Sequence, residues 1–96
     1  MMLALSDREA TALRAFLDAN ADCEALSERE YVADLYDLEA PMSMDLVFCD
    51  GGVRIDGACL LGYDEGMEGY YIAEPVTEPE KVRRALAEAG ALPPEQ

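Results

Sequence analysis

The chain has 96 residues, 51% of them apolar, and it carries 21 acidic residues against 7 basic ones and no histidine, for a formal net charge of −14. This length fits one domain, and the apolar content exceeds that of a disordered acidic tail. The charge excludes the basic surface that direct binding to DNA, RNA or an anionic membrane requires. The lack of histidine excludes Ser-His-Asp and Cys-His catalysis.

Two helices are expected in the N-terminal half, over residues 6–19 and 27–38. Each begins with a serine followed three residues later by a glutamate, which is the capping-box pattern. Each then repeats apolar residues at the spacing of one helical face. The residues concerned are Ser6, Glu9, Leu13, Phe16 and Leu17 in the first helix, and Ser27, Glu30, Tyr31, Leu35 and Leu38 in the second. Pro41 follows the second helix and prevents its continuation.

The apolar period changes after Pro41 and predicts a meander of short strands. Asp50-Gly51-Gly52 is a strong tight-turn signal, and Gly57 is expected to mark a bulge. The strands are expected at 44–49, 53–55, 59–61 and 70–73. Because neighbouring strand residues point to opposite faces, one of Tyr70 and Tyr71 should lie in the core. A last helix is expected over 78–89, with Thr77 as its N-cap, Glu80 completing a third capping box, and Gly90 at its end.

This element order predicts an α+β domain: two N-terminal helices, an antiparallel meander of three to four short strands, and one C-terminal helix, with helices over one sheet face. The domain is expected to span residues 1–92, and residues 93–96 to form a loose tail. No apolar run is long enough for a transmembrane helix, and the apolar stretch 1–5 is too short for a signal-peptide core. We therefore expect a cytoplasmic protein of a bacterial host cell.

The sequence offers little for catalysis or metal binding. It has no nucleophile elbow, phosphate-binding loop or dinucleotide fingerprint, so we expect no enzyme, no cofactor and no catalytic residues. Cys23, Cys49 and Cys59 are odd in number and widely spaced, which argues against a disulfide framework or a zinc site. Cys49 and Cys59 are expected to be buried. The acidic loop 64–69 does not match a calcium-binding loop, so no metal is expected.

The acids are unevenly distributed along the chain. Eight of them lie between Asp18 and Glu39, with one base among them. On the expected second helix Glu30, Asp34 and Asp37 would form a row, one carboxylate per turn of about 5.4 Å. Such a row could imitate a nucleic-acid backbone and bind a partner's Lys and Arg side chains. An ordinary solvated helix face is the alternative for this segment.

In size, charge and architecture, and in its acidic segment Glu28 to Glu39, the chain resembles the small acidic inhibitors of bacteriophages and mobile elements, which include some anti-CRISPR and antirestriction proteins. The resemblance implies an inhibitor that occupies the nucleic-acid-binding surface of a bacterial defence protein. The candidate partner-binding residues are Glu28, Glu30, Asp34, Asp37 and Glu39, a second cluster of Asp64, Glu65 and Glu68, and the aromatic Tyr36.

Two further questions stay open on the sequence. The protein could instead be a non-mimic interaction module, such as an immunity protein, antitoxin or adaptor, that binds through a tyrosine or apolar patch while the acids supply solubility. It could also be a monomer or a homodimer. Its bases Lys81, Arg83 and Arg84 lie within one turn, and they could neutralise nearby acids or pair with an acidic face of a second copy.

Overall fold

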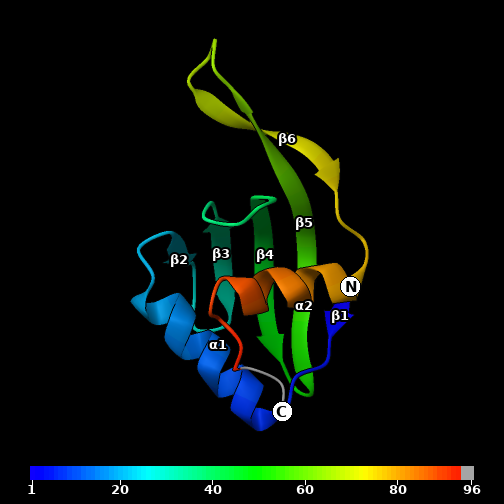
Figure 1. Ribbon diagram of the computed structural model, residues 1–96. Helices are drawn as coiled ribbons and strands as arrows, with labels where there is room; N and C mark the ends of the chain where they lie inside the picture. Colours follow the sequence, from blue (N-terminus) through cyan, green and yellow to red (C-terminus); the bar gives the residue numbers. More distant parts are fainter. Residues whose placement is uncertain (94–96) are drawn as a thin grey trace.

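The computed structural model describes residues 1–93 and has one antiparallel sheet of six strands with two helices over one of its faces (Figure 1). The elements in chain order are β1 (Met2–Leu3), α1 (Asp7–Ala19), β2 (Cys23–Ala25), β3 (Glu30–Leu35), β4 (Met42–Cys49), β5 (Gly52–Asp64), β6 (Gly69–Pro75) and α2 (Pro79–Glu88). The strand order is β1-β5-β4-β3-β2, and β6 pairs with the second half of β5.

Helix α1 forms as its sequence predicts. The Ser6 backbone N–H donates to the Glu9 carboxylate at 3.1 Å, and the Glu9 N–H donates to Ser6 Oγ at 3.2 Å, which completes the capping box. Leu13 and Leu17 are buried against the sheet. Local capping and one apolar face thus specify where this helix begins and which side it buries, and packing against the sheet stabilises it.

Helix α2 also lies where a helix is expected, but its start differs. Its N-cap is Glu78 rather than Thr77, and no side chain caps it, so the expected capping box does not form. Its end follows the sequence signal: Gly90 has φ +83°, and the Ala91 N–H bonds to the Leu86 carbonyl at 2.8 Å, as in a Schellman motif.

The prediction of a helix over 27–38 is wrong, because this segment forms the β2–β3 turn, strand β3 and the loop after it. Ser27 is not a cap: its Oγ accepts from the Arg29 N–H in the turn. Burial along β3 alternates, with Tyr31, Ala33 and Leu35 buried and their neighbours more exposed. The α+β class is as expected, but the described chain begins with a short strand, a single helix follows where two were expected, and the sheet has six strands, not three or four.

Electrostatics and pairing both explain why the strand forms. A helix would place the carboxylates of Glu30, Asp34 and Asp37 on successive turns, where like charges repel. In a strand Glu30 and Asp34 lie roughly 13 Å apart, at about 3.3 Å per residue. Strand β3 also pairs with β2 on one side and β4 on the other. These backbone hydrogen bonds involve residues distant in the sequence, which the local pattern does not reveal.

The β4–β5 hairpin matches the prediction, including its turn at residues 50–52 and its bulge. The register shifts between Asp45 and Leu46, opposite the step from Ile55 to Gly57. Strand β5 then continues to Asp64, far beyond the expected 53–61 segments. Its second half and β6 form a hairpin that projects from the body (Figure 1). We call residues 61–72 the arm.

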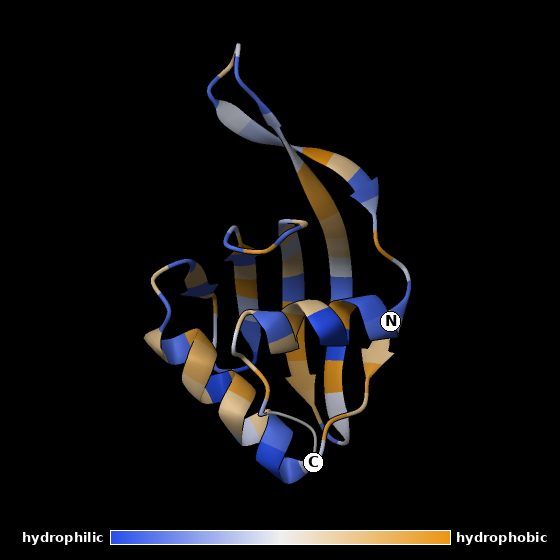
Figure 2. Ribbon diagram, in the orientation of Figure 1, coloured by the Kyte–Doolittle hydropathy of each residue, from blue (hydrophilic) through white to orange (hydrophobic). Residues whose placement is uncertain are grey.

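The core lies between the helices and the inner face of the sheet. Figure 2 shows apolar segments on the sheet strands and along the helices over them. Strand β4 alternates strictly, with Met42, Met44, Leu46 and Phe48 buried. Cys49 therefore falls on the other face and is exposed, and Cys59 is only half-buried, so their expected burial is wrong. Of the expected tail 93–96, only Pro93 is among the described residues.

Candidate protein-binding face

The sheet face that carries no helix, which we call the open face, is acidic. Strand alternation places every second residue of β2 to β5 on it, and cross-strand pairing groups them in rows such as Glu24, Val32 and Asp45. Its carboxylates belong to Glu24, Glu30, Asp34, Asp45 and Asp56, and its base is Arg54. Directly opposite residues on adjacent strands lie about 5 Å apart.

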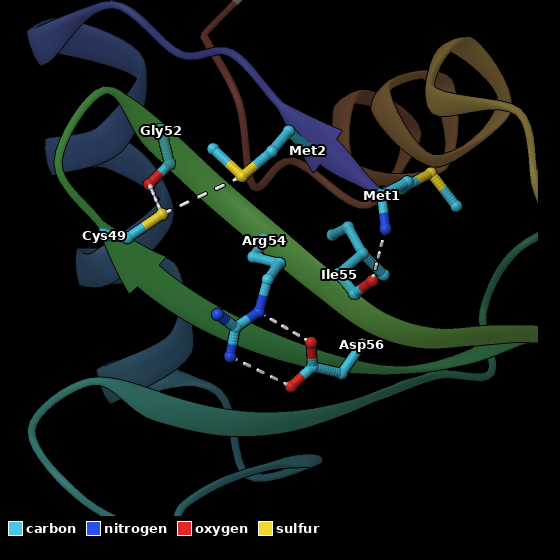
Figure 3. A network of polar contacts seen from close by, with 7 residues as sticks. All are labelled: Met1, Met2, Cys49, Gly52, Arg54, Ile55 and Asp56. Atoms are coloured by element: carbon cyan, nitrogen blue, oxygen red, sulfur yellow. Dashed lines mark hydrogen bonds and ion pairs between the residues drawn. The ribbon is translucent and has the colours of Figure 1, made fainter.

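Arg54 does not neutralise this face beyond its immediate neighbour. Its Nε donates to Asp56 Oδ1 at 2.7 Å (Figure 3). This hydrogen bond and the charge of Asp56 raise the pKa of the Arg54 guanidinium. At the same edge Met2 lies beside Cys49, whose Sγ is 3.9 Å from the Met2 sulfur (Figure 3). The four remaining carboxylates of the open face stay without a basic partner among the described residues.

Asp34 connects the acidic area to a group of tyrosines. Its carboxylate accepts a hydrogen bond from Ser43 Oγ at 2.5 Å, which fixes it on the β3–β4 pair. Tyr36 follows two residues later, and burial, together with the charge of Asp34, raises the pKa of its phenol. The Tyr36 hydroxyl therefore stays neutral further into the alkaline range than a free tyrosine.

Three tyrosines from distant parts of the chain form one exposed cluster, which we call the tyrosine cluster. The rings of Tyr36 and Tyr70 lie 4.7 Å apart, and those of Tyr63 and Tyr70 lie 5.1 Å apart with an edge-on geometry. The three are exposed at 37%, 54% and 47% in the order Tyr36, Tyr63 and Tyr70. Ile72, on the same side of the arm as Tyr70, is 72% exposed.

Tyr71 lies on the opposite side of the arm and is also exposed, so the expectation that one of the adjacent tyrosines is buried is wrong. The arm extends past the helices, and neither of its sides is covered by them (Figure 1). The Tyr71 ring instead lies over Gly62, where a Cβ would come within 2.6 Å of it. An aromatic ring over a strand glycine supports the hairpin locally.

The structure separates the predicted partner-binding residues into four places. Glu30 and Asp34 lie on the open face, and Tyr36 lies beside it. Glu28 belongs to the β2–β3 turn, and Asp37 and Glu39 to the loop after β3, all three exposed. The expected one-per-turn row of Glu30, Asp34 and Asp37 is therefore wrong, because it required a helix.

The second predicted cluster lies at the end of the arm. Asp64 Oδ1 accepts hydrogen bonds from the backbone N–H groups of Gly66, at 2.8 Å, and Met67, at 3.3 Å, and so shapes the turn. Glu65 and Glu68 are exposed on that turn. About five residues of strand, roughly 17 Å, separate this turn from the open-face row that contains Asp34.

The sequence did not single out three of the five open-face carboxylates, nor two of the three residues of the tyrosine cluster. Asp45 could have been found from the strict alternation of β4, which marks it as outward-facing. Tyr63 and Tyr70 flank a glycine-rich acidic loop, which is a hairpin signal that predicts cross-strand neighbours. Glu24 and Asp56 had no such local signal. Their place follows from the pairing of β2 with β3 and from the bulge in β5.

Within residues 1–93, no three His, Cys, Asp or Glu side chains gather in a way that could hold a metal ion. Neither described helix has the length and apolar character needed to cross a membrane. Comparison with protein-family models, curated proteins and solved structures finds no match for this chain. The geometry of the open face and the tyrosine cluster is therefore the basis for a functional proposal.

Proposed function

We propose that this protein is a binding module that holds a basic surface of a partner protein on its open face, with the tyrosine cluster as the anchor. The observation that carries the proposal is the continuity of an exposed three-tyrosine cluster with a carboxylate-rich sheet face. Tyrosines are enriched among residues that dominate binding energy, because they bury a large rigid ring at low entropic cost.

The charges of the open face explain why the partner surface should be basic. Unpaired carboxylates attract a basic surface and speed its encounter, whereas they repel nucleic acid and anionic membranes. The tyrosines then supply the contact area that remains when salt screens the charges. A partner with Lys and Arg side chains around an apolar groove would match both the carboxylates of the open face and the tyrosine cluster.

The experiment is a capture from a bacterial lysate with immobilised wild-type protein and two charge-matched variants. The face variant carries Glu24→Gln, Glu30→Gln and Asp45→Asn. The control carries Glu78→Gln, Glu80→Gln and Glu88→Gln around and within α2. Both lose three negative charges, but only the first loses them from the open face. We expect the control to capture the same partner as wild type and the face variant to lose it.

A third variant tests the anchor. Replacing Tyr63 and Tyr70 with Ser should weaken binding by about tenfold or more, and the loss should persist at high salt, since it removes apolar contact rather than charge. If both the face variant and the tyrosine variant captured the partner as well as wild type, the proposal would be wrong.

The charge of the open face also supports a second candidate, an inhibitor that occupies a nucleic-acid-binding surface of a bacterial defence protein, as some anti-CRISPR proteins do. The open face carries five carboxylates and one base, and a surface that binds nucleic acid attracts this negative charge. Addition of duplex DNA to the captured complex separates the two candidates. Displacement of the partner by DNA supports the inhibitor, and a complex that DNA leaves intact supports the non-mimic module.

A further inference from the structure

Strand β6 leaves one of its edges without a partner among the described residues, since it pairs with β5 alone. Its central residues Tyr71, Ile72 and Ala73 carry no charge, and Ile72 is largely exposed. Exposed edge strands are usually protected by charges, bulges or covering segments, because an open edge pairs with another chain. On β6 such protection lies toward the end of the strand, where the register shift of the β5–β6 pair leaves Ala73 without a partner and Glu74 and Pro75 follow; Tyr70 to Ile72 carry neither a charge nor a bulge.

The turn at the end of the arm and a cavity at its base are complementary. The turn, residues 64–69, carries three carboxylates, no base, and Met67, which is 82% exposed. The cavity has a volume of about 230 Å³, and its lining includes the apolar Met42, Leu60 and Val76. Lys81 and Arg84 of α2 line it too, with Glu88 as the one acid of the lining, and Lys81 also forms an exposed ion pair with Glu78 at 3.5 Å.

We propose that two copies of this chain pair through antiparallel β6 edges, so that the acidic turn of each arm docks in the basic cavity of the other. Antiparallel pairing centred near Ile72 sets Gly69 of one copy beside Pro75 of the second, because the strands run in opposite directions. Val76, which follows Pro75, lines the cavity. Edge pairing and cavity docking therefore result from one twofold arrangement.

The charge complementarity between the arm turn and the cavity favours a second copy of this chain as the partner of the β6 edge. Each chain carries −14, so two copies associate only where opposite charges meet. The arm turn and the α2 cavity provide such a meeting point twice in a twofold dimer. The dimer uses the turn of the arm and the β6 edge, and the open face stays free. This inference does not rest on the proposed function.

The test is a charge exchange followed by the molar mass in sedimentation equilibrium. The turn variant carries Glu65→Lys and Glu68→Lys; Asp64 is kept, because its carboxylate shapes the turn. The cavity variant carries Lys81→Glu and Arg84→Glu. We expect wild type to form dimers, and each variant alone to dissociate at least about tenfold more readily, because turn and cavity then carry the same sign.

Mixing the two variants is the decisive step. In the mixed pair the basic turn of one chain meets the acidic cavity of the other, and the acidic turn meets the basic cavity, so both contacts are restored. We expect the mixture to regain the wild-type dimer mass. The turn variant is also less negative overall than wild type, so general repulsion alone would make it associate more tightly, not less.

A third pair of variants tests the edge. Ile72→Lys places a charge at the centre of the β6 edge, so the protein should stay folded but become monomeric. Leu26→Lys, at another exposed apolar residue near β2, should leave the dimer unchanged. A wild-type protein that stays monomeric at every concentration overturns the inference, as does a mixture of turn and cavity variants that fails to associate. Circular dichroism confirms that each variant is folded.

Discussion

At the scale of single residues, Glu9 links three parts of the chain through one carboxylate. It accepts from the Ser6 backbone N–H at the start of α1, and it forms an ion pair with Arg83 of α2, which also donates to the Ala4 carbonyl. The Ser6 hydrogen bond, and then Arg83, hold the pKa of Glu9 below its usual 4.5, although partial burial acts in the opposite direction. Glu9 therefore fixes α1 and α2 to each other and to the segment after β1.

The Glu9→Gln substitution is predicted to lower the free energy of unfolding by about 1–2 kcal/mol at neutral pH, because it removes charge-assisted hydrogen bonds. A carboxyl whose pKa is depressed in the folded state stabilises the protein above its unfolded pKa and loses this effect as the pH falls. The difference between wild type and Glu9→Gln should therefore shrink as the pH falls below about 4.5.

Urea unfolding across this pH range checks the prediction. Asp7→Asn is the matched control, since Asp7 lies in the same first turn of α1. It should show at most a small, dipole-related effect. A difference between wild type and Glu9→Gln that stays constant with pH would contradict the assigned role of the carboxylate.

Gly51 and Gly52 form a second pair of residues with separable roles. Both have positive φ, +88° and +151°, but a Cβ at Gly51 would meet nothing within 4 Å, whereas a Cβ at Gly52 would lie 2.5 Å from the Leu3 carbonyl oxygen. Leu3 pairs with Val53 in the β1–β5 ladder. Gly52 therefore permits the N-terminal strand to approach β5 closely.

We expect Gly52→Ala to destabilise the protein by roughly 2 kcal/mol more than Gly51→Ala, since only the first adds overpacking against backbone to the conformational strain. Thermal unfolding of the two variants measures the difference. Amide exchange at Leu3 and Ile55 would report whether β1 detaches. Equal effects of the two substitutions would mean that β1 can shift without cost.

At the scale of elements, β3 shows how one local pattern can fit two structures. Residues 31, 35 and 38 fit a helical face, and residues 31, 33 and 35 fit a strand face equally well. The segment is too short for its apolar spacing to distinguish the helical period from the strand period. Its neighbours decide: β2 and β4 satisfy both edges of β3 with backbone hydrogen bonds.

The arm is an element that the core does not require. The buried residues pass from Ala58 directly to Val76, so residues 59–75 contribute none of them. We predict that joining Leu61 to Ile72 through an Asn-Gly turn changes the free energy of unfolding by less than about 1 kcal/mol, because a projecting hairpin is only marginally stable by itself.

Leu61 and Ile72 are directly paired, so a two-residue turn can close the shortened hairpin. Denaturant unfolding and circular dichroism measure the result. The shortened protein should keep its fold and lose both the tyrosine-dependent binding and the dimer. A protein that no longer folds would show that the arm supports the core.

At the scale of the whole molecule, charge governs stability as well as binding. The described residues contain three ion pairs, two of them exposed, so most of their carboxylates have no basic partner. Exposed ion pairs add little stability, and uncompensated like charges destabilise a compact state. The fold therefore relies on its apolar core to outweigh this repulsion.

Raising the salt concentration from about 0.01 M to about 0.1 M shortens the Debye length from roughly 30 Å to roughly 10 Å and should raise the melting temperature by several degrees. The face variant with Glu24→Gln, Glu30→Gln and Asp45→Asn should melt higher at low salt and gain less from added salt. Differential scanning calorimetry provides both values. A melting temperature that falls with salt would mean that local attraction, not repulsion, dominates the surface.

The sequence by itself determined the features that depend on neighbouring residues. It determined the net charge, the capping box of Ser6 and Glu9, the tight turn at residues 50–52, and the end of α2 at Gly90. The capping box, the turn and the helix end are each specified by residues a few positions apart, and the structure keeps all three, whereas strand pairing overrode the same kind of local signal at Ser27 and Glu30. The α+β class follows from these features.

Only the tertiary structure decided on which face of the sheet each side chain lies and which distant residues it contacts. It placed Glu30 and Asp34 on a sheet face instead of a helix, and it brought Tyr36 against Tyr70 from 34 positions away. These outcomes depend on strand pairing and register, in which hydrogen bonds join segments far apart in the chain. The sequence could therefore predict an acidic surface, but its shape and its aromatic anchor required the fold.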